Sequence, residues 1–227
     1  MSRSELLLAL LLTLCAATAA AQGSVSGQLS IIERAGAQPS DLRSTVVYLE
    51  TPGRTLPAAG FMSETTVAMT GREFVPHVRA VMVGSAVHFP NDDPFSHNVF
   101  SNAQAGPFDL GLYRRGTSRV ASFPRAAVYP IYCNIHSRMA AYVVAVTTPY
   151  VAFAAADGRF TLENVPAGSY LLRAWHEHAG TGSGITIVVP AGGITAQHLV
   201  LDARAYVAAP HLNKFGVPYT ATRADHY

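Results

Sequence analysis

The sequence predicts an all-β protein built from sandwiches or barrels. After residue 21 it consists of short runs rich in β-branched and aromatic residues, and Gly, Pro, Asn or Asp separates these runs. No segment beyond the N-terminal stretch shows a long helical period in its apolar residues. These two observations favour strands joined by turns over a helical or mixed fold.

The first element, residues 1–21, has the pattern of a secretory signal peptide. Arg3 lies near its start, an apolar run begins at Leu6, and three alanines at 19–21 end it. The apolar run is short and contains threonine, which disfavours a membrane span, although a retained anchor is the alternative. We therefore expect cleavage, export, and a periplasmic mature protein with no membrane span.

The composition of the chain is that of a globular protein. Of its residues, 49% are hydrophobic and 13% are charged, and the formal net charge is +2. This charge is too small to indicate nucleic acid as a partner, and the sequence has no basic cluster. The roughly 205 residues that follow the signal allow one large or two small domains.

The predicted strands differ in their chemistry along the chain. Residues 64–147 hold the cysteine, histidine and methionine stretch, whereas the sequence on both sides is simpler and rich in Gly and Ala, so we expect two units. The strand-like runs cover residues 44–50, 78–89, 119–123, 127–133, 140–147, 159–162, 169–175 and 184–189.

Cys133 is the one cysteine expected in the mature chain, because Cys15 lies within the signal. An unpaired cysteine in an oxidising compartment pairs between chains, reacts, or binds something. In a β-strand, Tyr129, Ile131 and Cys133 share one face and would point into a core. Cys133 would then lie at the end of its strand, where the chain turns.

Two further candidate ligands follow in the stretch YCNIHSRM, residues 132–139. His136 and Met139 come three and six residues after Cys133, so a turning loop can aim all three side chains at one point. His97, in a loop rich in Pro, Asp and Asn, offers a fourth ligand. Two imidazoles, a thiolate and a weak thioether form the ligand set of a blue-copper electron-transfer centre, whereas structural zinc sites do not recruit Met. Taken singly, each residue could instead be an ordinary core or loop residue.

Three stretches of residues 64–147 form a pattern with the candidate ligands: VGSAVHFPNDDPFSHNVFS (83–101), FDLGLYRRGTSRVASF (108–123) and YCNIHSRMAAYVVAV (132–146). By these stretches, residues 64–147 resemble a cupredoxin of the plastocyanin and amicyanin kind, which implies a Greek-key sandwich. The resemblance implies that His97, Cys133 and His136 are equatorial ligands and Met139 the axial ligand of one type 1 copper per chain.

The same resemblance implies how an electron would enter and leave. The side chain and backbone of Asn98 would tie the two ligand loops together near the sulfur, and the ring edge of His136 would reach the surface. An apolar patch around that edge would dock a redox donor or acceptor, such as a dehydrogenase or a cytochrome, through a small and weak interface. Tyr132 is a second possible port for the electron. The residues expected in the patch are Pro94, Phe95, Gly106, Pro107 and Ile135.

The flanks resemble two halves of one carboxypeptidase-regulatory-like, or transthyretin-like, β-sandwich. Its opening strands would lie in residues 22–63 and the remainder in 148–203, where DGRF and NVPAGSY are similar to that family. The cupredoxin would then be inserted in this sandwich, because each half alone has too few strands to bury a core. A separate small domain next to the cupredoxin is the alternative. Residues 204–227 are predicted to be an irregular tail.

The leading functional hypothesis is a periplasmic carrier of single electrons rather than an enzyme. A copper carrier or storage protein is the main alternative, although its expected cluster of methionines is missing. A copper enzyme would need a second site, for which only His176 and His178 are available; a structural module with a vestigial site is the last alternative. The other histidines are interpreted as structural or surface residues: His77, His88, His198, His211 and His226.

Overall fold

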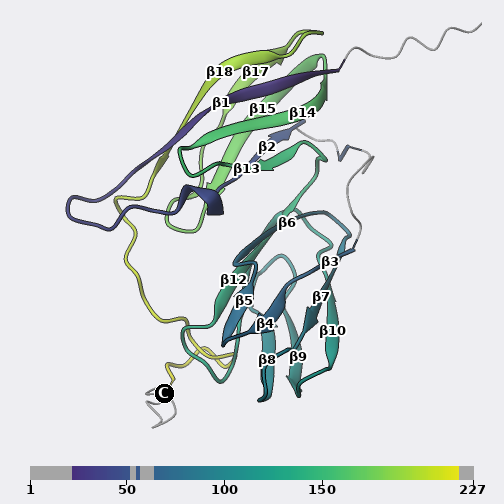
Figure 1. Cartoon of the computed structure of the whole chain (residues 1–227), viewed down its shortest axis with the longest axis vertical. Coiled ribbons are helices and arrows are strands. Elements are labelled where there is room, and N and C mark those ends of the chain that lie inside the picture. The colour runs from purple at the N-terminus through teal and green to yellow at the C-terminus, as the bar shows by residue number, and fades with distance from the viewer. Residues whose placement is uncertain (1–21, 52–54, 57–63, 220–227) are drawn as a thin grey trace, which may run out of the picture.

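A computed structural model describes residues 22–51, 55–56 and 64–219 of the chain (Figure 1). The signal-peptide prediction, residues 1–21, lies outside the described residues. Within them, no helix is both long enough and apolar enough to span a membrane. The described chain folds almost entirely into strands, with one 3-10 turn, η1 (Leu42–Ser44), which confirms the all-β prediction.

The upper sandwich in Figure 1 has two facing sheets. The three-stranded sheet has the order β14 (Arg159–Pro166), β1 (Gln22–Ile32), β18 (Ile194–Asp202). The second sheet has the order β13 (Val151–Phe153), β2 (Val46–Glu50), β15 (Gly168–His176), β16 (Gly180–Thr181), and β17 (Ile185–Val189) also pairs with β15. Strands β1 and β2 thus pair with strands from residues 151–202, so the intervening chain leaves this sandwich and returns to it. Its transthyretin-like identity stays a prediction.

The lower sandwich is formed by the chain between β2 and β13. One sheet has the order β10 (Ser118–Ser122), β7 (Ala86–Pro90), β3 (Glu64–Thr66). The other has the order β6 (Val78–Met82), β12 (Ala140–Val146), β11 (Ala127–Tyr132), β8 (His97–Ser101), β9 (Phe108–Tyr113), and a hairpin joins β4 (Ala68–Thr70) to β5 (Glu73–Val75).

The single run predicted over residues 78–89 is two strands, β6 and β7. Gly84 has a φ of 87°, and the Ser85 N–H donates to the Met82 carbonyl, so the chain turns there. A positive φ is the conformation that glycine adopts at little cost. The prediction of one continuous strand is therefore wrong, since it did not take Gly84 as a turn.

The two sandwiches contact each other through side chains that their strands turn outward. In β2, Val47 and Leu49 point into the upper core, while Val46 and Tyr48 point the other way and are still buried. Such alternation is the geometry of a strand covered on both faces. The cluster between the sandwiches joins Val46, Tyr48 and Trp175 to Val78, Ala80, Val144 and Val146.

Candidate metal centre

The predicted ligands lie at one end of the lower sandwich, on two neighbouring strands and the loop after one of them. His97 is the first residue of β8, and Cys133 follows the last residue of β11. Tyr132 of β11 pairs with Phe100 of β8, which sets these strand ends side by side. Tyr129, Ile131 and Cys133 all have no exposed surface and lie in one core cluster, which confirms that they share the inward face.

Three donor atoms converge at this end. The ligand atoms of His97, Cys133 and His136 all lie within 4.8 Å of one another. The Cys133 Sγ is 3.7 Å from the Nδ1 of His97 and 3.5 Å from the Nδ1 of His136. Metal bonds of about 2.0 Å to nitrogen and about 2.3 Å to sulfur, at trigonal or tetrahedral angles, separate such donors by roughly 3.5–3.8 Å. The three side chains are therefore spaced as ligands of one ion.

Met139 lies in the same buried cluster as Cys133 and is 1% exposed. The loop that joins the two residues is closed by its own backbone. The Cys133 N–H donates to the Met139 carbonyl at 3.2 Å, and the Met139 N–H donates to the His136 carbonyl at 3.1 Å. A short closed loop thus holds the thiol and the thioether at the same end of the core.

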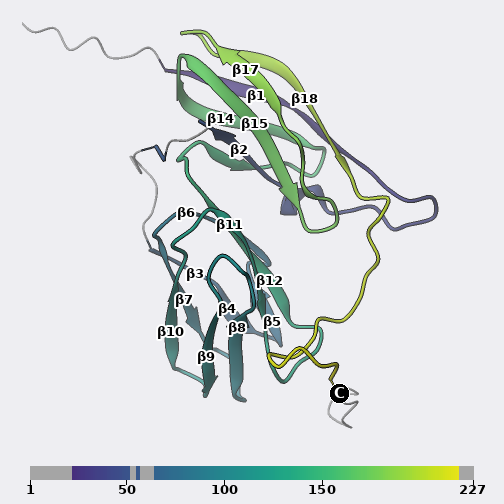
Figure 2. The ribbon, with the colours of Figure 1, turned by 180° about the vertical axis from the view of Figure 1, so that it is seen from behind.

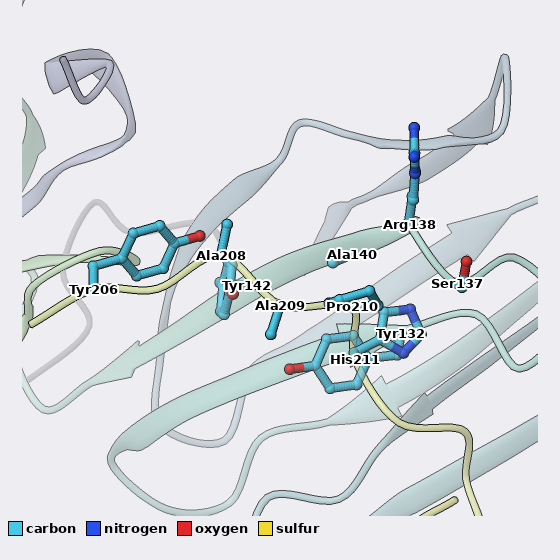
Figure 3. A pocket seen from close by; sticks show the side chains of 10 residues that line it. All are labelled: Tyr132, Ser137, Arg138, Ala140, Tyr142, Tyr206, Ala208, Ala209, Pro210 and His211. Atoms are coloured by element: carbon cyan, nitrogen blue, oxygen red, sulfur yellow. The ribbon is translucent and has the colours of Figure 1, made fainter. Parts of the chain in front are cut away.

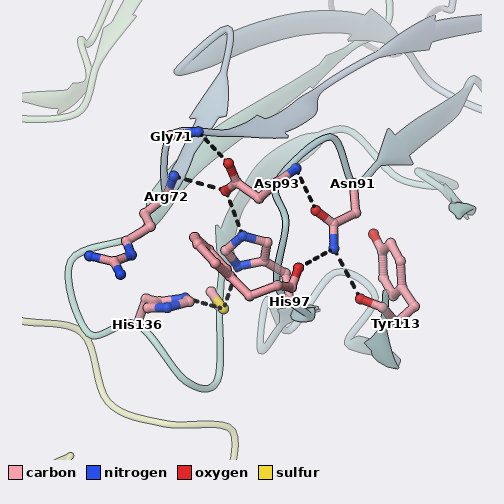
Figure 4. A network of polar contacts seen from close by, with 9 residues as sticks. Gly71, Arg72, Asn91, Asp93, His97, Tyr113 and His136 are labelled. Atoms are coloured by element: carbon pink, nitrogen blue, oxygen red, sulfur yellow. Dashed lines mark hydrogen bonds and ion pairs between the residues drawn. The ribbon is translucent and has the colours of Figure 1, made fainter. Parts of the chain in front are cut away.

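His97 is oriented by a carboxylate. Its Nε2 lies 2.7 Å from the Oδ2 of Asp93, and both side chains are almost fully buried (Figure 4). An ionised carboxylate only accepts hydrogen bonds, so Nε2 carries the proton. The other nitrogen of the ring, Nδ1, faces the sulfur of Cys133. A carboxylate on the second nitrogen is the usual partner of a metal-binding histidine.

Asp93 is itself fixed by a tight turn. The backbone N–H groups of Gly71 and Arg72 donate to its carboxylate at 2.6 and 2.9 Å. Both residues have positive φ, 64° and 62°, and they form the two-residue loop between β4 and β5. Burial raises the pKa of Asp93, but the hydrogen bonds from Arg72, His97 and Gly71 outweigh it and leave the pKa below its usual value. The carboxyl is therefore an anion in the folded protein at neutral pH.

Asn91, which has no exposed surface, holds the loop that carries Asp93 and His97. Its Nδ2 donates to the carbonyls of Phe95 and Tyr113 at 2.9 and 3.1 Å, and its Oδ1 accepts from the Asp93 N–H at 3.0 Å (Figure 4). Neither Asn91 nor Asp93 was predicted from the sequence as a residue of the site. The available signal was an acidic residue four positions before the candidate ligand His97.

The surroundings of Cys133 suit a thiolate only when a cation is present. Burial raises the pKa of the thiol, and the backbone N–H groups of Ile135, Asn98 and His136 offset part of that rise. A bound metal cation deprotonates a coordinating thiol outright. These N–H groups are then in place to stabilise the charge on sulfur.

Asn98 departs in part from its expected role. Its backbone N–H faces the sulfur of Cys133, as the resemblance implied. Its side chain instead donates from Nδ2 to the Oδ1 of Asp109, at 2.6 Å, and its own Oδ1 is buried with no hydrogen-bond partner. A register shift in the β8–β9 pair between Asn98 and Phe100 accompanies this arrangement. The prediction that the side chain of Asn98 ties the two ligand loops together is therefore wrong.

The aromatic surroundings of the site lie on the side of His136. This ring is partly exposed, whereas His97 is buried. Phe95 packs against both, with ring centroids 5.2 Å from His97 and 5.8 Å from His136, and the guanidinium of Arg72 lies over Phe95. Pro94 and Ile135 are exposed beside the site.

Two residues of the expected patch lie elsewhere. His97 pairs with Tyr113 at the metal end of the β8–β9 pair, whereas Phe108 pairs with Ser101 at the opposite end. Gly106 and Pro107 immediately precede Phe108, and Gly106 lies against Tyr129. Their placement around His136 is therefore wrong, because the strand register carries them to the other end of the sandwich.

His176 and His178 do not extend the metal chemistry. Among residues 22–51, 55–56 and 64–219, the group of His97, Cys133 and His136 is the one set of three or more His, Cys, Asp or Glu ligand atoms within 4.8 Å. His176 ends β15 and is 1% exposed, and His178 lies in the turn after it.

Comparison with known proteins gives partial similarities. No family model matches the chain, and no curated protein matches it. A copper-containing nitrite reductase from Thermus scotoductus SA-01 is 26% identical over 37% of this chain, with a TM-score of 0.35, and the match spans only 22% of the nitrite reductase chain.

Two smaller proteins are matched over almost their whole length. A purple cupredoxin from Nitrosopumilus maritimus is 22% identical, with 36% of this chain and 99% of that chain covered and a TM-score of 0.33. The reduced state of an amicyanin point mutant is 20% identical, with 44% of this chain and 99% of that chain covered and a TM-score of 0.35. Each similarity covers less than half of this chain.

Proposed function

We propose that this protein carries single electrons through one type 1 copper ion held by His97, Cys133, His136 and Met139. The observation that supports this most directly is a buried thiol with the Nδ1 atoms of two histidines at 3.7 and 3.5 Å and a buried methionine in the same cluster. Two imidazoles, one thiolate and a weak thioether are typical of blue-copper electron-transfer centres.

The bound copper would supply a Cu(II)/Cu(I) couple. The protein's part is to keep the donors in place, so that the change of oxidation state needs little rearrangement. Asp93 fixes the ring of His97, and the closed loop from Cys133 to Met139 fixes both sulfur donors. Water is kept away, since His97 and Cys133 have no exposed surface and Met139 has 1%.

This burial favours an electron carrier over the alternative, a copper carrier or storage protein. A protein that hands over its ion needs donors that an acceptor can reach, whereas the sulfur atoms here are covered. An electron needs only a ligand edge near the surface, and the partly exposed ring of His136 supplies one.

We infer that the partners are a redox donor and a redox acceptor, which dock weakly where Pro94, Phe95 and Ile135 surround His136. Small interfaces are usual for such encounters. We also place the protein in the periplasm, on the strength of the signal pattern in residues 1–21.

The test is to add Cu(II) to the purified copper-free protein and to record its visible spectrum and metal content. An intense blue or green thiolate-to-copper band at one copper per chain is expected, and the Cys133→Ala variant should lack it. A colourless protein, or equal copper binding by the variant, would overturn the electron-carrier proposal.

A further inference from the structure

The C-terminal strap, residues 204–219, connects the upper sandwich to the metal end of the lower one. After β18 the chain leaves the upper sandwich and runs down to the loop that follows β11, as both views of the ribbon show (Figures 1 and 2). The sequence predicts an irregular tail here. The segment has no strand or helix, but its side chains make specific contacts at the metal end.

Two of these contacts are hydrogen bonds to the ligand loop itself. The hydroxyl of Tyr219 donates to the carbonyl of Cys133 at 2.7 Å. The backbone N–H of Lys214 donates to the Oδ1 of Asn134, the next residue, at 2.9 Å. The strap therefore holds both the backbone of the thiol residue and the side chain that follows it.

A second set of contacts fixes the strap against strands next to the site. The ring of His211 stacks on Tyr132, with centroids 4.2 Å apart and planes 13° apart (Figure 3). Within the strap, the hydroxyl of Tyr219 lies 3.3 Å from the Nδ1 of His211, which links the two residues that contact the site. The Nζ of Lys214 lies 2.6 Å from the Oδ2 of Asp109 in β9.

The strap is not packed evenly along its length. Between Tyr206 and His211 it borders a pocket of about 370 Å³, whose other wall includes Tyr132, Arg138 and Tyr142 (Figure 3). Close contact with the lower sandwich is made by His211, Lys214 and Tyr219, where the ligand loop lies. The strap thus makes polar contacts with the lower sandwich through Lys214 and Tyr219.

We propose that the strap is part of the metal centre, and that Tyr219 and Lys214 are positioning residues for Cys133. The proposal rests on the proposed copper function. A ligand loop already held in its bound geometry loses less conformational freedom when the ion binds, so it retains the ion more tightly. Partners outside the ligand set commonly matter for metal affinity in this way. The upper sandwich thereby gains a role, because the strap extends from its last strand.

The first experiment compares Tyr219→Phe with the matched control Tyr206→Phe in the full chain. Tyr206 belongs to the same strap, but its ring stacks on His178 at the end of the upper sandwich. Copper release from the loaded proteins to an excess of chelator is measured, with the reduction potential and the electron paramagnetic resonance spectrum. Loss of one hydrogen bond predicts release about five- to tenfold faster for Tyr219→Phe and no change for Tyr206→Phe.

The second experiment ends the chain after Ala203, which leaves β18 complete. Amide hydrogen exchange is measured in the copper-free proteins. Exchange in residues 134–137 is expected to be at least about tenfold faster without the strap, while exchange in β6 and β12 stays unchanged, which shows that the sandwich remains folded.

The outcomes separate this inference from the proposed function. If the wild-type protein forms the copper band and Tyr219→Phe releases copper at the wild-type rate, Tyr219 has no positioning role, although the copper function stands. If the wild type binds no copper, the copper function fails. If, in addition, truncation leaves amide exchange in residues 134–137 unchanged, the inference that the strap positions the ligand loop fails as well.

Discussion

The two histidine pairs of this protein are equally close but differently used. The ring centroids of His97 and His136 are 4.9 Å apart, and those of His176 and His178 are 5.0 Å apart. In the first pair both Nδ1 atoms face the sulfur of Cys133. In the second pair both Nδ1 atoms have other partners, since His176 accepts from the backbone N–H of His178 at 3.2 Å and His178 lies 2.8 Å from the hydroxyl of Ser40.

The difference shows that proximity of two imidazoles does not make a metal site. A ligand nitrogen needs a free lone pair directed at a shared point, together with a further donor there. The Nδ1 of His97 is left to face the shared point because Asp93 accepts a hydrogen bond from the opposite nitrogen, Nε2. His178 is also covered by the ring of Tyr206, stacked at 3.8 Å. In the part of the chain that the structure describes, the second pair therefore lacks the converging donors that the first pair has.

The largest expected effect comes from removing a histidine of the first pair, and the same change in the second pair serves as the control. His136→Ala should lower the affinity for Cu(II) by more than about a hundredfold, beyond the range found for residues that only support ligands. His178→Ala should leave copper affinity and colour unchanged, because His178 is not one of the proposed copper ligands. Competition with a chelator measures both, and equal losses in the two variants would contradict the distinction between the pairs.

The next effect concerns the carboxylate behind His97. Asp93→Asn should lower copper affinity by about 10- to 100-fold, because it removes the charge that fixes the ring and leaves the N–H groups of Gly71 and Arg72 with a weaker acceptor. It should also raise the reduction potential, since loss of a nearby negative charge disfavours Cu(II) more than Cu(I). The shift would be roughly 60 mV for each tenfold change in the ratio of the two affinities.

Asp92→Asn is the matched control for this prediction. Asp92 is the preceding residue and its side chain is exposed. The same loss of charge at Asp92 should leave copper affinity unchanged within twofold, and a response equal to that of Asp93→Asn would show that net charge rather than ring orientation matters.

His176 should affect stability without affecting copper. It is 1% exposed, and burial lowers the pKa of its ring, as does the neighbouring His178, so the ring is neutral in the fold. His176→Leu removes the acceptor of the His178 N–H and should cost about 1–3 kcal/mol of unfolding free energy. Chemical denaturation measures this cost, and an altered copper stoichiometry in the same variant would show that the second pair does bind metal.

The features that could be predicted from the sequence are those that strand alternation and loop spacing determine. Cys133 lies inward because it continues the alternation of Tyr129 and Ile131, and His136 converges with it because the loop is short. The all-β class followed from the same local patterns. These features depend on residues close together in the chain, which is why a single sequence reveals them.

The rest depends on pairings that a single sequence does not show. Asp93 is held by the turn at Gly71 and Arg72, about twenty positions earlier, and Cys133 is held by Tyr219, 86 positions later. Gly106 was misplaced because the register of β8 and β9 determines which loop reaches the metal end. Such contacts follow from the tertiary fold rather than from local spacing.

The smallest expected effect concerns the acidic residue between the second pair of histidines. Glu177 does not hold either of them as closely as Asp93 holds His97. Its Oε1 is 4.0 Å from the Nε2 of His178, whereas its Oε2 lies 3.0 Å from the Nε2 of His77 in the lower sandwich. The hydrogen bond with Glu177 is the main cause that raises the pKa of His77. Burial raises the pKa of Glu177, but the hydrogen bond and charge of His77 outweigh it and lower the pKa.

The pH dependence of this contact follows from the two shifts. The raised pKa of His77 gives stability that is complete below its ordinary value of 6.5 and is lost as the pH rises through the folded value. The lowered pKa of Glu177 gives stability that is present above 4.5 and is lost as the pH falls through its folded value. Since His77 is partly exposed, the wild type should exceed Glu177→Gln in unfolding free energy by less than about 1 kcal/mol at about pH 5.5, and by less still at about pH 8.5. An advantage that is equal at both pH values would mean that Glu177 joins the sandwiches by packing rather than by charge.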